Sequence, residues 1–188
     1  MVRAQASVRP QVTVRSTSGG ALASRGGSPR MTRRDFFAAV IEGMRRDLPS
    51  ELAAFRHRAN PMLLKVDYGN ERIHYEVMAD GERERLEIGL HFEDGPASTA
   101  AYLAFFDARI VEIKHLLGPQ IELERWTLSW GHLFESVPLA PLDRRFAQSV
   151  GSCLARQIAV LQPLVVEAAI APGRHDPSTH RPRWRRGH

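Results

Sequence analysis

Residues 62–92 read MLLKVDYGNERIHYEVMADGERERLEIGLHF, and their apolar side chains recur at every second position. Side chains along a β-strand alternate between the two faces of a sheet, so this period predicts strands that are apolar on one face and polar on the other. Gly69-Asn70 and Asp80-Gly81 supply turn residues between the runs. The stretch therefore predicts an antiparallel meander of three strands.

A helix is predicted immediately before the meander. Thr32 and Asp35 have the spacing of a capping box, and the apolar side chains that follow recur at helical intervals until Pro49. A short second helix is expected from Ser50 to Phe55. The apolar residues that share one face of the first helix are Phe37, Ile41, Met44 and Leu48.

Two further helices are predicted after the meander. One spans residues 103–117 and stops at Gly118-Pro119, and the other spans residues 142–161, where Pro163 either ends or kinks it. Between these helices, the parity of the apolar residues changes within the segment 121–136. A strand cannot change faces without a bulge or a turn, so this segment is either two short strands or one bent strand.

The element order is α-β-β-β-α-β(-β)-α, which predicts an α+β fold: an antiparallel sheet, made of the meander plus one or two further strands, packed against helices. Residues 32–170 form the single predicted domain. The flanking segments 1–31 and 171–188 are rich in Arg with Gly, Ser or Pro, and we expect both to be disordered, basic tails.

The positive charge is concentrated in these tails. The net charge of the chain is +5, yet residues 1–34 hold seven arginines and no acid, and the stretch from Asp35 to Ile170 holds 14 basic against 20 acidic residues. Phosphate binding requires Lys and Arg on a structured face or on a dedicated arm. Weak, sequence-independent contact with nucleic acid is therefore expected only through the tails.

Cys153 is the single cysteine, which excludes an internal disulfide and a multi-cysteine zinc site. No uncharged apolar run approaches the roughly 20 residues that a membrane span requires. Charged residues also follow the twin-arginine-like segment 32–37, so it lacks the apolar stretch of an export signal. We expect a cytoplasmic protein without membrane association.

Polar residues occupy the outward parity of the second and third meander strands. Two histidines and three carboxylates on neighbouring strands could bind a divalent metal or act as an acid and base pair. One face of an antiparallel sheet is commonly wet, so we expect instead a solvated or partner-contacting surface and no metal. Gly89 is the one hint of a pocket. The candidate residues are His74, Glu76, Glu87, His91 and Glu93.

Trp126 and Trp130 share one parity and form a candidate aromatic surface, for which core packing is the alternative. The sequence contains no Gly-rich phosphate loop, nucleophile elbow or HExxH motif. No catalytic residue can be assigned, no cofactor is expected, and the sequence favours a protein that is not an enzyme.

By element order, residues Thr32 to Leu161 resemble the type III secretion chaperone-like fold, whose members are small, often dimeric proteins that bind other polypeptides without catalysis. The resemblance carries no motif and transfers no site residue. It implies a non-catalytic binding or chaperone-like module that contacts another polypeptide and can form a homodimer. The alternatives are a small metal-dependent hydrolase using the polar face of the meander, and nucleic-acid association through the tails.

Overall fold

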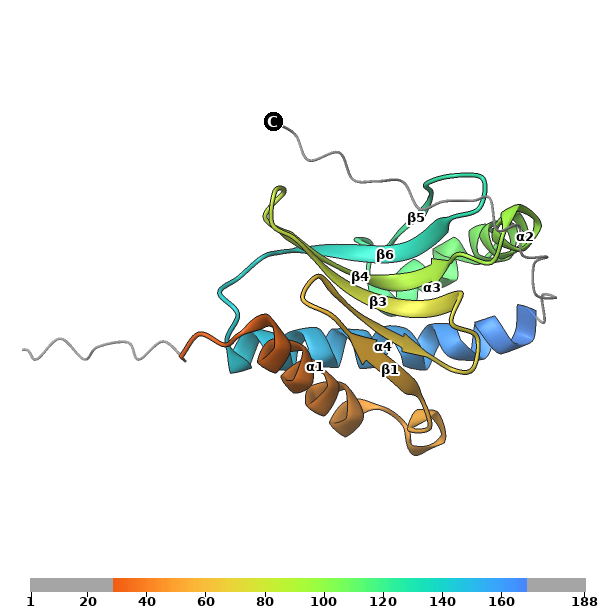
Figure 1. The fold of residues 1–188 in the computed structure, drawn as a ribbon. Coiled ribbons are helices and arrows are strands. Elements are labelled where there is room, and N and C mark those ends of the chain that lie inside the picture. Colours follow the sequence, from red (N-terminus) through yellow and green to blue (C-terminus); the bar gives the residue numbers. More distant parts are fainter. Residues whose placement is uncertain (1–28, 169–188) are drawn as a thin grey trace, which may run out of the picture.

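The computed structural model describes residues 29–168, which form an antiparallel six-stranded sheet packed against helices (Figure 1). The α+β class predicted from the sequence is confirmed. Residues 1–28 and 169–188, which include most of the first predicted tail and all of the second, lie outside the described residues. The elements are α1 (Arg33–Asp47), a 3-10 turn (Ser50–Leu52), β1 (Arg56–Ala59), β2 (Leu63–Asp67), β3 (Ile73–Asp80), β4 (Arg85–Phe92), α2 (Pro96–Asp107), α3 (Ile110–Leu117), β5 (Glu122–Arg125), β6 (Gly131–Pro138) and α4 (Arg144–Ala168).

The strand order across the sheet is β1-β2-β3-β4-β6-β5, and every neighbouring pair is antiparallel. The predicted meander is β2, β3 and β4. The register of β3 against β4 runs from Ile73 opposite Phe92 to Asp80 opposite Arg85. β1 and β5 are the two edges of the sheet.

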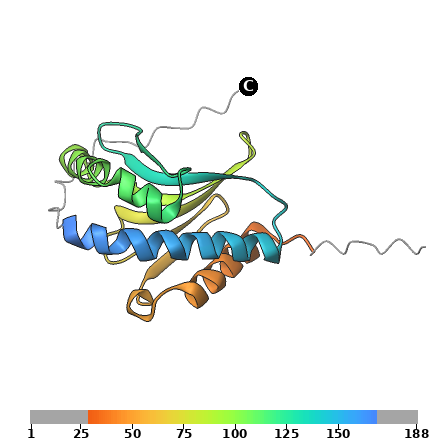
Figure 2. The same ribbon diagram turned by 180° about the vertical axis from the view of Figure 1, so that it is seen from behind.

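The helices gather on one face of this sheet. Figure 2 shows α4 running along that face with α1 and α3 on either side of it, while α2 lies at one end. In β2, β3 and β4 the residues that point toward these helices are apolar and buried, as the period of two requires, and Leu133 on β6 lies among them. They are Leu64, Val66, Ile73, Tyr75, Val77, Leu86, Ile88, Leu90, Phe92 and Leu133.

α1 and α4 pack most closely at two glycines. A Cβ atom added to Gly151 would lie 2.6 Å from the carbonyl oxygen of Val40 and 2.8 Å from the amide of Met44. A Cβ atom on Gly43, in the facing helix, would lie at an ordinary 3.5 Å from the backbone of Gln148. The helix crossing therefore depends on the missing side chain of Gly151.

α4 continues through Pro163 to Ala168, so the proline does not end it. Its length and its apolar composition would also suit a membrane span. In this fold, however, its apolar face is buried against α1 and the sheet, with Val150, Leu154 and Ile158 all buried. An ordinary core helix has the same composition.

Two local predictions need correction, and a third, which left two alternatives open, is decided. The expected second helix ends at Leu52, and Arg56–Ala59 forms an edge strand instead, paired with β2 and held by the ion pair of Arg56 with Asp67. The helix predicted at 103–117 is divided into α2 and α3 at Ala108 and Arg109, where the Arg109 guanidinium donates to the Phe105 carbonyl. The segment 121–136 proves to be two strands, β5 and β6, joined by a tight turn.

We predict that Gly151→Ala destabilises the protein by about 1–3 kcal/mol, because its methyl group forces backbone atoms of α1 and α4 apart. The matched change Gly43→Ala meets only ordinary contacts and should be neutral or stabilising by up to about 1 kcal/mol through helix propensity. Urea denaturation of both variants measures the difference. Equal effects of the two changes would contradict the account of the crossing.

Candidate functional site

The face of the sheet opposite the helices carries a row of polar residues that crosses all six strands. Because paired residues in neighbouring strands lie side by side on the same face, the registers place one residue of each strand in this row. In strand order the row is Arg56, Asp67, His74, His91, His132 and Glu124.

The next row on the same face brings Lys65 opposite Glu76 and Glu76 opposite Gly89. A Cβ atom on Gly89 would lie 2.5 Å from both the Leu133 carbonyl oxygen and the Phe134 Cβ. Gly89 therefore permits the close approach of β4 and β6. The missing side chain does not open a pocket, contrary to the hint taken from the sequence.

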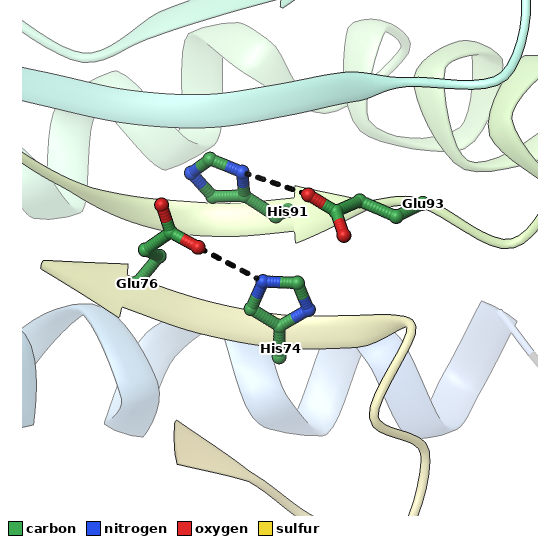
Figure 3. Close-up of side chains that lie close together, drawn as sticks. All are labelled: His74, Glu76, His91 and Glu93. Carbon is green, nitrogen blue, oxygen red and sulfur yellow. Dashed lines mark hydrogen bonds and ion pairs between the residues drawn. The ribbon is translucent and has the colours of Figure 1, made fainter. Parts of the chain in front are cut away.

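Four of the five candidate residues converge. Figure 3 shows His74 and Glu76 on β3 beside His91 and Glu93 on β4 and its end, all on the side away from α4. One nitrogen or oxygen atom from each of the four lies within 4.8 Å of the others. The His74 Nε2 to Glu76 Oε2 distance is 3.3 Å, and His91 Nδ1 lies 4.0 Å from Glu93 Oε1. We call these four residues the His–Glu cluster.

Lys65 reaches into the His–Glu cluster from β2. Its Nζ lies 2.8 Å from His74 Nε2, 3.1 Å from Glu76 Oε2 and 3.5 Å from Glu93 Oε2. One ammonium thus contacts three of the four members. Lys65 was not among the candidates predicted from the sequence, although it shares the outward parity of β2 and could have been found from that parity.

His74 Nε2 faces two partners that require opposite roles. A lone pair on Nε2 can accept a hydrogen bond from Lys65 but then meets the Glu76 carboxylate, whereas an Nε2–H group can donate to Glu76 but then meets the ammonium. No hydrogen-bond partner is present for His74 Nδ1, which is also buried. Neither neutral tautomer of His74 therefore satisfies its surroundings.

The expectation of a solvated polar face is wrong for most of the cluster. His74 is fully buried, Glu76 and His91 are 5% and 4% exposed, and only Glu93 is half-buried. Long side chains and stacked rings on the face itself exclude water there, an effect that the alternation pattern could not reveal. Burial of this many polar groups is costly, which makes the cluster a candidate functional site.

Burial governs the protonation of this face. It lowers the pKa of His91 to about 3, against an opposing effect of the Glu76 carboxylate, and it lowers the pKa of His132 as well. Burial alone would raise the pKa of Glu76, but the hydrogen bond with His74 and the charge of Lys65 help to bring it to about 2. At neutral pH, His91 is uncharged and Glu76 is ionised.

The two tryptophans do not share a strand face, because both lie in the turn between β5 and β6. Trp126 is 37% exposed and packs on His132 and His91, with ring centroids 4.3 Å and 5.8 Å away. His132 in turn stacks on Phe134 at 3.9 Å. Trp126 therefore belongs to the border of the buried polar face, whereas Trp130 is half-buried beside it.

Glu87 stays outside the cluster. It is half-buried farther along β4, and burial raises its pKa.

A different buried acid was not predicted as a candidate from the sequence. Glu135, on the helix-facing side of β6, accepts hydrogen bonds from Gln120, Gln157 and the Cys153 thiol. Burial raises the pKa of that thiol, which makes Cys153 a packing residue rather than a nucleophile.

A second feature is a cleft of about 770 Å³ between α1 and the β1–β2 hairpin. Phe37, Ile41 and Leu64 provide its buried apolar wall. Four arginines and one glutamate contribute to its lining, and they are Arg33, Arg34, Arg45, Arg58 and Glu42. This cleft was not predicted from the sequence, since it depends on β1, a strand that was not predicted.

The fold and these two features define an α+β domain with one apolar sheet face under helices and one buried polar face. No protein-family model matches the chain, and no curated protein has a matching sequence.

We predict that the free energy of unfolding of the protein, freed of any bound metal by a chelator, falls as pH drops from about 6.5 toward 3. In that window an unfolded chain protonates His91, with an ordinary pKa of 6.5, while the folded chain, with a pKa of about 3, does not. Protons therefore favour unfolding. Denaturant titrations at several pH values should show that His91→Gln lowers the slope by up to about 1.4 kcal/mol per pH unit.

The control is His115→Gln, which removes an exposed imidazole on α3 and should keep the wild-type slope. An unchanged slope in His91→Gln would mean that His91 takes up its proton in the folded state.

Proposed function

We propose that this chain is a non-catalytic polypeptide-binding module, which holds an extended acidic segment of a partner along β1 and in the adjoining cleft. The observation that carries the proposal is the combination of a free strand edge with a basic, apolar-walled cleft on the same element. A cytoplasmic location belongs to the same proposal.

The outer edge of β1 offers backbone hydrogen bonds. The Asn60 amide donates to the Leu63 carbonyl at the hairpin, and hydrogen-bonded pairs alternate along an antiparallel ladder. His57 and Ala59 therefore direct their N–H and C=O groups away from β2. No strand within residues 29–168 lies on that side. An extended peptide can add there as a further strand, a common mode of peptide recognition.

Charge selects the occupant. Arg34 is exposed and has no ion pair within the described part of the chain, and Arg45 lies over the Phe55 ring at 5.2 Å with its charge facing solvent. The chain's own tails are rich in arginine and would be repelled. The charges on β1 also discourage pairing between two copies of this chain, because Arg56 and Arg58 of one copy would be repelled by Arg56 and Arg58 of the other. An acidic strand fits both conditions.

The buried His–Glu cluster supports a binding function rather than the alternative of a hydrolase. A substrate must reach its catalytic groups, yet His74 is 0% exposed and Glu76 and His91 are almost as deeply buried. Chemistry on an external substrate at this position would require the face to open.

Fluorescence anisotropy with a labelled peptide of alternating Glu and Val tests the proposal. We expect saturable binding that weakens with salt, and no binding of a Lys-Val peptide. Arg34→Glu should weaken binding by about tenfold. Arg145→Glu, a charge reversal at an exposed residue outside the cleft, should not. Equal binding of both peptides would refute charge selection.

The strand-addition geometry has its own test. Ala59→Pro removes the outward N–H without touching the ladder to β2, and proline is tolerated on a free edge. Ala59→Pro should abolish peptide binding. Ala59→Thr introduces a side chain similar in size to proline but keeps the backbone N–H, so it should preserve binding. Self-association of the wild-type chain that competes with the peptide would instead identify a second copy as the occupant and overturn the acidic-partner proposal.

A further inference from the structure

The His–Glu cluster supplies the donor atoms of a transition-metal site. Two imidazole nitrogens and two carboxylate oxygens form a set that suits zinc and related first-row divalent ions. Tetrahedral coordination bonds of about 2.0–2.2 Å place the ligand atoms about 3.3–3.6 Å apart. The four donors already lie within 4.8 Å of one another, so small rotations suffice, and half-buried Glu93 has the most freedom to make them.

The charges at the cluster favour a further cation. Lys65 contributes one positive charge, whereas Glu76 and Glu93 contribute two negative charges. The two arginines of β1 are already engaged, since Arg56 pairs with Asp67 and Arg58 with Glu71. With both imidazoles neutral, a single ammonium balances only one of the two carboxylate charges.

The position of the Lys65 ammonium indicates where an ion would lie. It contacts three of the four prospective ligands, and its four-carbon stem lets it withdraw toward solvent. A divalent ion in its place would balance both carboxylates. It would also remove the conflict at His74 Nε2, because a ligating nitrogen needs only its lone pair. The site would be closed, with four protein ligands and no access for a substrate, as in structural zinc sites.

We propose that His74, Glu76, His91 and Glu93 form a structural site for a first-row divalent transition metal, which displaces the ammonium of Lys65. This site lies on the face of the sheet opposite the helices, and it is independent of the proposed peptide binding at β1. It reverses our expectation from the sequence, which rested on a wet face.

Calorimetric titration of the chelator-treated full chain with Zn²⁺ tests the site, with Co²⁺ absorption as a report on coordination. We expect one ion per chain, a raised melting temperature and the visible bands of four-coordinate Co²⁺. Glu93→Gln, at the least buried ligand, and His91→Asn should each weaken binding by at least about tenfold. Glu71→Gln and His115→Gln, outside the cluster, should bind as wild type.

The variant Lys65→Met distinguishes a metal site from a cluster that is stabilised only by the Lys65 ammonium. If the ammonium competes with the ion, this variant binds Zn²⁺ more tightly than wild type, and added Zn²⁺ restores the melting temperature that it loses. Weaker binding in Lys65→Met would overturn the proposal. So would a lack of stoichiometric binding in the wild type, or unchanged binding in both Glu93→Gln and His91→Asn.

Discussion

The antiparallel register of β3 against β4 determines which side chains meet on each face of the sheet. With Ile73 opposite Phe92, β3 and β4 present apolar residues to the helices on one face, and on the other face His74 lies beside His91. A shift of one residue would send the histidines into the apolar core and the core residues outward. The helix packing and the polar cluster therefore rest on the same pairing.

The buried residues on the two faces of the sheet are stabilised in different ways. The helix-facing side is stabilised by the transfer of apolar area from water and by close packing, including the glycine contact between α1 and α4. The opposite side buries ionised groups, and its stability depends on pairing each charge. Lys65 meets only part of that demand. This imbalance distinguishes the cluster from an ordinary solvated strand face.

Much of the fold could be predicted because the sheet is built from local patterns. Alternation in residues 62–92 and the turn residues between its runs were enough to locate three strands. β1 was missed because Arg56 to Ala59 are all exposed and show no alternation; the strand exists through its pairing with β2. The members of the cluster followed from parity, but their burial did not, since it depends on neighbours such as Trp126 that arrive from another part of the chain.

The contact between α1 and α4 joins the first and last described elements of the domain. Ser152 on α4 donates to Asp47 at the end of α1, two residues 105 positions apart in the chain. During synthesis, every strand of the sheet leaves the ribosome before the helix that covers much of its apolar face. Contacts between such distant segments slow folding and leave apolar surface exposed for longer. The nascent chain must therefore remain unaggregated until α4 emerges. Docking of α4 is then the step that commits the domain to its native state.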